Sequence, residues 1–421
     1  MILSLLSLSV IRCLMSDALL DELEHKAVLY FWERSNEKNG FTRDRAVNSD
    51  QPGDAGVASC AAVGFALAAY PIGVERYWVS RKEALERTRL TLRHLNADWP
   101  SSHGFLYHFI DPFTSARQWN CEVSSIDTSI CLAGVIVAEQ YWHDPQVSRE
   151  ARAFEKRIDW KWMLTDGGKE PAAVHFSMGW SPEHEFIPNR WNHFDENKML
   201  YIQAYGFSSI TTAGWDKIER PLVHYKGVDV ITGGPLFMHQ MSESFYDFKG
   251  KRDRLGFSYS VESRNAALAN RQYCIENPLK MKSYGPSFWG LSACDTPTGY
   301  AANGAPGWIH DDGTITPTSA VASIQWLPTE ALEFATTMRS DHPQAWGRYG
   351  FPNGYNPTKG WVDKEVIGID LGMMLLAIEN TRTGMPLKLS MSHPAITRGF
   401  ERAGLHKIKG ADSGPLHMSA K

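Results

Sequence analysis

Three segments of this sequence are apolar on nearly every face of a helix, and they constrain the fold more than any other feature. They are residues 55–70, 125–142 and 366–378. A helix without a polar face has to be buried on all sides. These segments alternate with helical segments that keep a charged outer face, 80–97 and 148–163. The alternation predicts two concentric layers of helices, with the apolar helices on the inside.

Capping residues and periodicity place further helices along the chain. An amphipathic helix is expected over 17–35. Later candidates are 195–206, 261–275, 329–339, 366–380 and 393–403. Expected N-caps are Ser16 or Asp17 for the first helix, Asp54 for 55–70, and Ser80, in a capping box with Glu83, for 80–97.

The order of elements favours a single helical domain. Strand patterns are few, with residues 104–111 the clearest, and no β-α-β rhythm suggests a parallel sheet. An (α/α)6 toroid needs twelve helices, and about 35 residues for each helix and its loop fits a chain of this length. We therefore predict an all-α fold. It is a single (α/α)6 toroid over residues 17–421, with long aromatic loops, a few short strands, and residues 1–16 as an N-terminal extension or weak signal-like segment.

Charge and hydropathy exclude several kinds of partner. The net charge is −4, from 43 basic and 47 acidic residues, so no basic field indicates nucleic acid. Residues 2–11 are apolar but too short to span a membrane, and no membrane insertion is expected. They lack the flanking pattern of a signal peptide, so a cytoplasmic location is expected. A periplasmic or secreted protein is the alternative if residues 1–16 act as a signal segment; the oligomeric state stays open.

Motifs for several common chemistries are missing from the sequence. It has no GxSxG elbow, no Walker A or GxGxxG loop, no HExxH and no CxxC pair. Neither a cofactor nor a metal site is therefore expected. The aromatic content is high, at 12% with 15 Trp and 15 Tyr. Aromatic rings suit a core, and their flat faces also suit sugar rings. Two long loops, 289–317 and 346–361, are rich in them.

Acidic residues in apolar surroundings are the strongest chemical signal. Asp127 and Asp370 lie inside apolar helices, Asp195 and Glu196 follow an aromatic cluster, and Asp44 stands between two arginines. Helix-dipole stabilisation or a structural ion pair could account for each of them. Glycoside hydrolysis is the functional alternative, because it needs one protonated carboxyl as acid and one carboxylate as base or nucleophile.

A series of motifs in a fixed order resembles the glucoamylase-like domain family. The motifs cover about residues 25–405 and include GFTRDR, GFLYHFID, EVSSIDTSICLAG, MGWSPE, DENKMLYI, GGPLFMHQMS, NRQYCIEN, WGLSA, DGTITPTSAVAS, YGFPNGYNP and IGIDLGMMLLAIEN. The resemblance implies an (α/α)6 toroid. It relates the chain to endo-β-1,2-glucanases and to the transglycosylase domain of cyclic β-1,2-glucan synthases.

The resemblance also implies roles for particular residues. Glu196 matches the family's general acid, and Asp127 and Asp370 match recurrent acidic positions, either of which could be the base. Water activation through a substrate hydroxyl is compatible with this pattern. Substrate contacts are expected from Asp44, Arg45, Glu122, Trp180, Trp191, Trp289, Phe351, Tyr355 and Asn356.

The expected activity is inverting hydrolysis of β-1,2-glucan or its oligosaccharides. Two departures from the family pattern, Ser129 and Leu371, leave endo or exo action and chain-length preference open. The alternatives are transglycosylation, hydrolysis of another glucan linkage, and a non-catalytic glucan-binding toroid. Asp195 is expected to be an N-cap with Glu196 in the first helical turn, where the helix dipole lowers a carboxyl pKa. A general acid there needs enclosure or a neighbouring carboxylate that outweighs the dipole.

Overall fold

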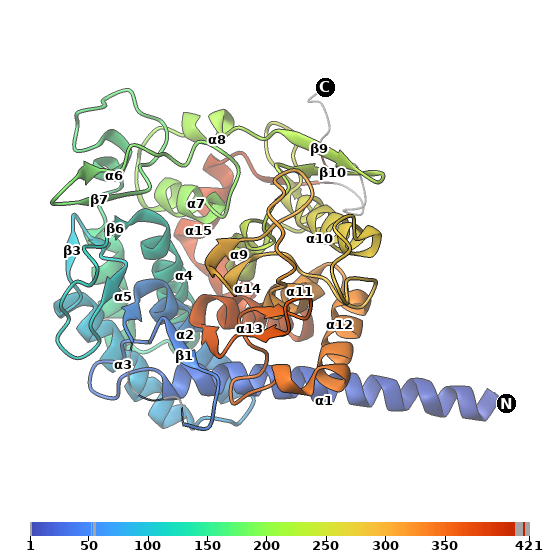
Figure 1. The fold of residues 1–421 in the computed structure, drawn as a ribbon. Helices are drawn as coiled ribbons and strands as arrows, with labels where there is room; N and C mark the ends of the chain where they lie inside the picture. Colours follow the sequence, from blue (N-terminus) through green and yellow to red (C-terminus); the bar gives the residue numbers. More distant parts are fainter. Residues whose placement is uncertain (1, 52, 54–55, 409–415, 417–421) are drawn as a thin grey trace.

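A computed structural model describes residues 2–51, 53, 56–408 and 416, and this part of the chain is mostly helical (Figure 1). Among the described helices, the largest fractions of buried residues are in α2 (Cys60–Glu75), α4 (Ser125–Trp142), α7 (Lys198–Phe207), α9 (Phe237–Phe245), α11 (Pro317–Ala322) and α13 (Gly368–Arg382). The other α-helices are α1 (Ile2–Glu33), α3 (Arg81–Ala97), α5 (Pro145–Arg157), α6 (Trp160–Thr165), α8 (Ala213–Lys217), α10 (Tyr259–Glu276), α12 (Pro328–Asp341), α14 (Met385–Ser392) and α15 (Pro394–Arg402). Two 3-10 turns are η1 (Ser323–Gln325) and η2 (Pro343–Ala345).

The strands are short and form small antiparallel ladders. They are β1 (Arg45–Val47), β2 (Ala58–Ser59), β3 (Ser101–Ser102), β4 (Phe105–Leu106), β5 (Phe109–Ile110), β6 (Val123–Ser124), β7 (Gly179–Ser181), β8 (Glu185–Phe186), β9 (Leu222–Tyr225), β10 (Val228–Ile231), β11 (Lys251–Arg252), β12 (Ala293–Thr296), β13 (Gly299–Ala302), β14 (Tyr355–Asn356), β15 (Trp361–Val362), β16 (Glu365–Ile367) and β17 (His406–Lys407).

Several of these ladders tie together the segments that lead into the buried helices. Strand β2 precedes α2 and pairs with β5, while β6 precedes α4 and pairs with β7. Strand β16 precedes α13 and pairs with β1. Each ladder is a separate small sheet, and two isolated bridges, Arg43 with Ala58 and Tyr107 with Val123, connect their segments. The N-terminal ends of three buried helices are thereby held by linked short strands. This end of the helices carries the acidic residues described below.

Close backbone contact packs the buried helices against one another. Helix α2 packs on both α4 and α13, and α11 packs on α13. At the crossing of α2 and α4, a Cβ added to Gly134 would lie 1.8 Å from the carbonyl oxygen of Gly64. The two glycines therefore permit an approach that larger residues would block. In Figure 1, α1, α3, α5, α10 and α12 lie around the periphery of the molecule.

The structure confirms several helix predictions and corrects others. Residues 125–142 form α4 as predicted, and Ser80 caps α3 by accepting the backbone N–H of Glu83. The first helix begins at Ile2 and runs through Ser16 and Asp17, so the caps predicted there are wrong. Asp54 lies outside the described residues.

Two further boundaries differ from the prediction because other residues cap the helices. Helix α2 begins at Cys60, where the Ser59 side chain accepts the N–H of Ala62. The helix expected over 148–163 is two helices, α5 and α6. Asp159 lies between them and caps α6 through the N–H of Trp162.

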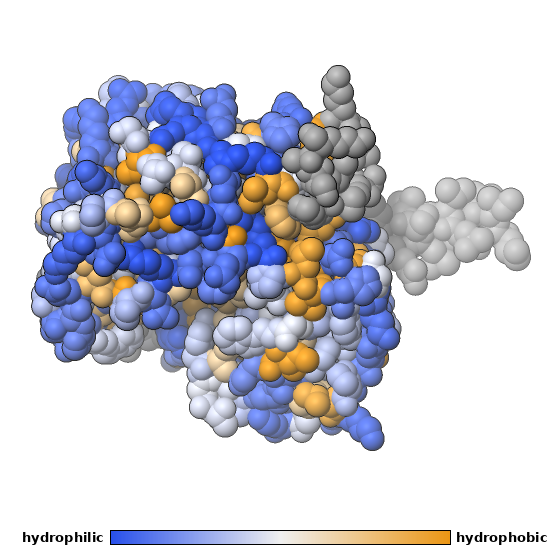
Figure 2. Space-filling view, turned by 90° about the horizontal axis from the view of Figure 1, so that it is seen from above, coloured by the Kyte–Doolittle hydropathy of each residue, from blue (hydrophilic) through white to orange (hydrophobic). Residues whose placement is uncertain are grey.

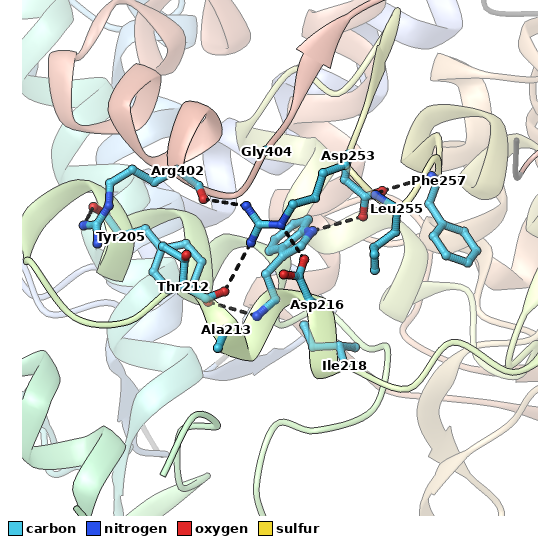
Figure 3. Close-up of polar contacts among 12 residues, drawn as sticks. Tyr205, Thr212, Ala213, Asp216, Ile218, Asp253, Leu255, Phe257, Arg402 and Gly404 are labelled. Carbon is cyan, nitrogen blue, oxygen red and sulfur yellow. Dashed lines mark hydrogen bonds and ion pairs between the residues drawn. The ribbon is translucent and has the colours of Figure 1, made fainter. Parts of the chain in front are cut away.

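A polar network fastens α8 to the C-terminal part of the fold (Figure 3). The buried Asp253 carboxylate accepts hydrogen bonds from the Trp215 indole at 3.0 Å and from the Tyr259 hydroxyl at 2.7 Å. Arg254 forms an ion pair with Asp216 of α8, and Arg402 of α15 donates to the Tyr205 carbonyl of α7 at 2.6 Å. These hydrogen bonds satisfy the Asp253 carboxylate, so stabilisation of the fold is enough to explain the network.

Hydrophobic residues on one face of the molecule form separate patches within a largely hydrophilic surface (Figure 2). Solvent-exposed large apolar residues include Tyr77, Trp119, Tyr300 and Trp308. Among the helices of the described ranges, none combines the length and apolar character that crossing a membrane requires.

Candidate active site

The three acids predicted to be catalytic lie at the N-terminal ends of different buried helices. Asp127 is in the first turn of α4, Asp370 is in the first turn of α13, and Glu196 immediately precedes α7. Burial is the main cause that raises the pKa of Glu196 and of Asp370, and neighbouring charges add to it: Asp127 acts on Glu196, and Asp44 acts on Asp370. Asp127 also acts on Asp44, which connects the two pairs. The fold thus brings acids from distant parts of the sequence to one end of the helical core.

Glu196 has the environment that a general acid needs. Burial, followed by the charge of Asp195, raises its pKa well above the ordinary value. Its Oε2 is enclosed and has no hydrogen-bond partner among the described residues. The predicted capping role of Asp195 is wrong, because α7 begins only at Lys198 and Asp195 accepts the backbone N–H of Glu196 instead, at 2.9 Å. Glu196 therefore lies in the turn before the helix.

A histidine connects two of the predicted acids. His108 lies between them, with Nδ1 3.1 Å from Glu122 and Nε2 3.4 Å from Asp127. Burial alone would lower its pKa, but Asp127 and Glu122 outweigh that effect and raise it to about 9. Asp127 also accepts a hydrogen bond from the Ser124 hydroxyl at 2.6 Å. The imidazolium holds both carboxylates in place.

The same three side chains lie close enough to share a metal ion, since one ligand atom of each lies within 4.8 Å of the others. In its protonated form His108 donates from both nitrogens to these carboxylates. A metal ion could bind here only after the imidazole loses a proton.

Asp370 belongs to a second group of polar side chains. Burial raises the pKa of its carboxyl to about 7, against the opposing effect of a 2.5 Å hydrogen bond from Asn353. Asn353 also accepts the backbone N–H of Asp295 at 2.7 Å. Arg45 lies beside this group and pairs with Asp295 at 2.8 Å, with Asp44 and with Glu365. Arg45 therefore fixes the positions of several acids.

Tyr300 lies near these acids on the β12–β13 hairpin. It is paired with Asp295 in the hairpin, and 59% of the residue is exposed. Burial raises the pKa of its phenol, and the charges of Asp370 and Glu196 act in the same direction. The phenol is therefore enclosed near both candidate catalytic acids while other parts of the residue stay exposed, so the side chain can contact a bound ligand.

Two predicted aromatic residues border the acids. Trp191 is 7% exposed, and its indole donates to the Ser125 hydroxyl at the start of α4, at 2.8 Å. Trp180 in β7 is half-buried and packs edge-on against Trp162. Trp180 keeps surface for a ligand, whereas Trp191 chiefly anchors the segment before Glu196.

Four predicted substrate-contact residues lie in the core instead. Trp289 and Phe351 expose no side-chain surface, and Phe351 packs edge-on against Trp346. The Tyr355 hydroxyl is occupied by His342 and Gln344. The buried Asn356 amide donates to the Asp312 carbonyl and to Thr314. The structure thus shows these four side chains occupied in packing and in holding the loops together, and their contact with substrate stays a prediction.

Sequence reasoning missed His108, Asn353, Asp295 and Tyr300 as parts of the site. Three of them lie within or next to recognised motifs, His108 in GFLYHFID, Asp295 after WGLSA and Asn353 in YGFPNGYNP. Their positions within or beside those motifs could have identified these three residues as candidate site residues. Tyr300 carries no such signal, because only the hairpin geometry brings it near the acids.

Comparison with known proteins confirms the family resemblance. Residues 188–394 match the Glycoamylase family model, described as "Putative glucoamylase". This region contains Glu196 and Asp370. Asp127 and His108 lie before it.

Individual relatives extend the similarity across most of the chain. It is 27% identical to an exo β-1,2-glucooligosaccharide sophorohydrolase (non-reducing end) of Parabacteroides distasonis, over 92% of this chain and 58% of that protein. The chain thus spans little more than half the length of that curated relative. An endo-β-1,2-glucanase structure from Chitinophaga pinensis, with sophorotriose and glucose, is 25% identical with a TM-score of 0.85, covering 93% of this chain and 99% of the other. A crystal structure from Bacteroides fragilis, described as "putative glucoamylase", is 29% identical with a TM-score of 0.84, covering 94% of this chain and 98% of the other.

Proposed function

We propose that this protein is a glycoside hydrolase that cleaves β-1,2-glucan or its oligosaccharides with inversion of the anomeric centre. One observation carries the proposal above all. Glu196 is a carboxyl with an enclosed, unpartnered oxygen and a strongly raised pKa, electrostatically linked to another acid at the same end of the core. The raised pKa favours the protonated form of this carboxyl, which can donate its proton to a glycosidic oxygen.

The proposed chemistry needs a base on the other side of the sugar. Asp370 and Asp127 are the candidates. The pKa of Asp370, about 7, suits a base that works near neutral pH. Asp127 is bound by His108 and Ser124, which favours a role in holding substrate or a water molecule. As the glycosidic bond breaks, Glu196 transfers its proton to the leaving oxygen. The base takes a proton from water directly or through a substrate hydroxyl, and the water oxygen bonds to the anomeric carbon.

The proposed β-1,2 linkage of the substrate and the proposed arrangement of the helices are inferred from similarity to the relatives. The Parabacteroides and Chitinophaga proteins bear names that specify β-1,2-linked substrates, and their similarity covers more than nine-tenths of this chain. We propose that the helices form an (α/α)6 toroid, an arrangement supported by the buried α2 in contact with both α4 and α13. The acids then lie at the open end where the N-termini of the inner helices meet.

The proposal is tested by incubating the protein with linear β-1,2-glucan and with β-1,2-linked oligosaccharides, and by measuring released reducing ends. Glu196→Gln should lower kcat by about 100-fold or more, because the proton donor is gone. Glu86→Gln, on the exposed face of α3, is the matched control and should leave kcat unchanged. Intact glucan, or full activity in Glu196→Gln, would contradict the proposal.

The product pattern separates the alternatives. Release of sophorose alone indicates exo action, and a range of oligosaccharides indicates endo action. Products longer than the substrate indicate transglycosylation. Cleavage of a β-1,3- or α-1,4-glucan in place of β-1,2-glucan would show that the substrate is a glucan of another linkage. Saturable binding without any product would indicate a non-catalytic toroid.

A further inference from the structure

An exposed tryptophan is held next to the acids by a strained turn. Trp119 lies in the loop between β5 and β6, and 72% of its surface is exposed. It and Asn120 both have positive φ angles, 54° and 50°. The N–H of Cys121 donates to the carbonyl of Gln118, which closes the turn around them at 3.0 Å. Two successive positive φ angles favour Gly, Asn or Asp, so a tryptophan here is a costly choice.

The strained turn is clamped from several sides. Arg117 donates to the carbonyls of Cys121 at 2.5 Å and Asn120 at 2.6 Å. The same guanidinium binds both carboxylate oxygens of Glu183, from the neighbouring β7–β8 connection, at 2.8 and 2.9 Å. It also lies over the ring of Tyr107, 4.7 Å from the centroid. This clamp fixes the turn and so fixes the direction in which Trp119 projects.

A continuous row of rings connects Trp119 to the acids. Its ring packs edge-on against Phe109 at 5.2 Å, and Phe109 stacks on His108 at 3.7 Å. His108 in turn contacts Asp127 and Glu122. Trp119 is therefore two ring contacts from the histidine that holds these acids, on the solvent-exposed side of the loop.

We propose that Trp119 is a stacking platform for a glucosyl unit of the oligosaccharide chain, outside the units that flank the cleaved bond. The inference rests on the proposed function and adds a subsite to it. An indole face matches the apolar C–H face of a glucopyranose ring, and a rigid platform binds without losing side-chain freedom. The exposed Asn120 next to it offers an amide for sugar hydroxyls. Binding of a glucosyl unit by the exposed ring would explain why a tryptophan occupies this strained turn.

The test uses Trp119→Asn, because asparagine suits the positive φ better than tryptophan does. Tyr77→Asn is the matched control. Tyr77 is 94% exposed and also has a positive φ, 61°, but lies beyond the C-terminal end of α2, away from the acids. Binding of β-1,2-, β-1,3- and α-1,4-linked gluco-oligosaccharides of increasing length is measured by calorimetry in the Glu196→Gln background, and turnover is measured with Glu196 intact.

We expect Trp119→Asn to weaken binding of long β-1,2-linked oligosaccharides by about 10-fold. Binding of the shortest ligand should stay the same, the melting temperature should not fall, and Trp119→Phe should restore most of the affinity. Tyr77→Asn should change only stability. Unchanged affinity for long chains in Trp119→Asn would overturn the subsite. So would a fall in affinity that is equal for all lengths and accompanied by a lower melting temperature, which would mark a structural role.

Further outcomes separate this inference from the proposed function. Normal cleavage of β-1,2-glucan with no effect of Trp119→Asn would leave the function standing and remove the subsite. If Trp119 is needed to bind another glucan and β-1,2-glucan is not cleaved, the subsite stands and the proposed β-1,2-glucanase function falls. If no oligosaccharide binds, both the subsite and the proposed function are overturned. If Trp119→Asn changes the oligomeric state in size-exclusion chromatography but not saccharide affinity, the ring belongs to an interface between copies.

Discussion

The candidate acids differ in what surrounds each carboxyl, and these surroundings divide their roles. Burial, followed by the charge of the adjacent Asp195, raises the pKa of Glu196 and favours its protonated form. Asp127 is held by the His108 imidazolium and the Ser124 hydroxyl. Asp370 is buried but stabilised by one amide, that of Asn353. The surroundings of Glu196 and Asp370 raise the pKa of each carboxyl, as acid–base catalysis near neutral pH requires.

Asp370→Asn should lower the activity while it raises the stability at high pH. An unfolded Asp has a pKa near ~3.9, whereas the folded value is about 7. Folding therefore favours the protonated form, and the free energy of unfolding falls as the pH rises from about 4 to 7. Asn removes this cost, so the variant should melt a few degrees above the wild type at pH 8 and show little gain at pH 4. Its kcat should fall by about 100-fold or more.

The control for that variant is Asp341→Asn, at the exposed C-terminal end of α12. It should alter neither kcat nor the pH dependence of melting. In the wild type, kcat/KM should increase as the pH rises through about 7. An Asp370→Asn enzyme that keeps wild-type kcat would show that Asp370 is not the base.

The acids were predictable one by one, and most of the loop residues around them were not. Asp127 and Asp370 stand out because a charged residue within an apolar helix is rare without a purpose. Trp289 and Phe351 belong to aromatic loops in which a buried ring and a sugar-binding ring look alike in sequence. Only tertiary packing decides between them. The contact of His108 with both Glu122 and Asp127 likewise depends on the approach of two loops.

At the level of elements, apolar periodicity predicted the longer buried helices well, and capping chemistry predicted the ends of helices less well. Residues 125–142 match α4 because a helix apolar on all faces has few alternatives. The start of α7 was misplaced because Asp195 binds the nearest backbone N–H and the helix starts later, at Lys198. Short helices such as α9 and α11 went unpredicted, because too few residues carry a clear period.

The crossing of α2 and α4 gives a prediction at this scale. Gly134→Ala places a Cβ against the Gly64 backbone, a contact of 1.8 Å that neither helix can relieve without moving. We expect a loss of about 1–3 kcal/mol in the free energy of unfolding, measured by urea denaturation. Because α4 carries Asp127, kcat should fall as well.

Gly285→Ala is the matched control, since a Cβ there meets nothing closer than 4.0 Å. It should change the free energy of unfolding by less than about 0.5 kcal/mol. Equal stability of the two alanine variants would show that α2 and α4 do not pack as closely as described.

For the whole molecule, the arrangement of the buried helices explains why the site lies where it does. Short strands hold the N-terminal ends of α2, α4 and α13 together, and each segment brings polar side chains to the same end. Exposed aromatic residues, Trp119 and Tyr300, stand on separate loops around these acids. The loops that carry the proposed ligand contacts are thus set upon a scaffold of packed helices.

The stereochemistry of the first product is the most direct test of the central claim. Linear β-1,2-glucan is incubated with the protein, and the anomeric proton signals of the new reducing ends are followed by NMR before mutarotation mixes them. Inverting hydrolysis directed by Glu196 predicts that the α-anomer appears first, and that Glu196→Gln does not produce it. Initial formation of the β-anomer, or the absence of any new reducing end, would contradict the account.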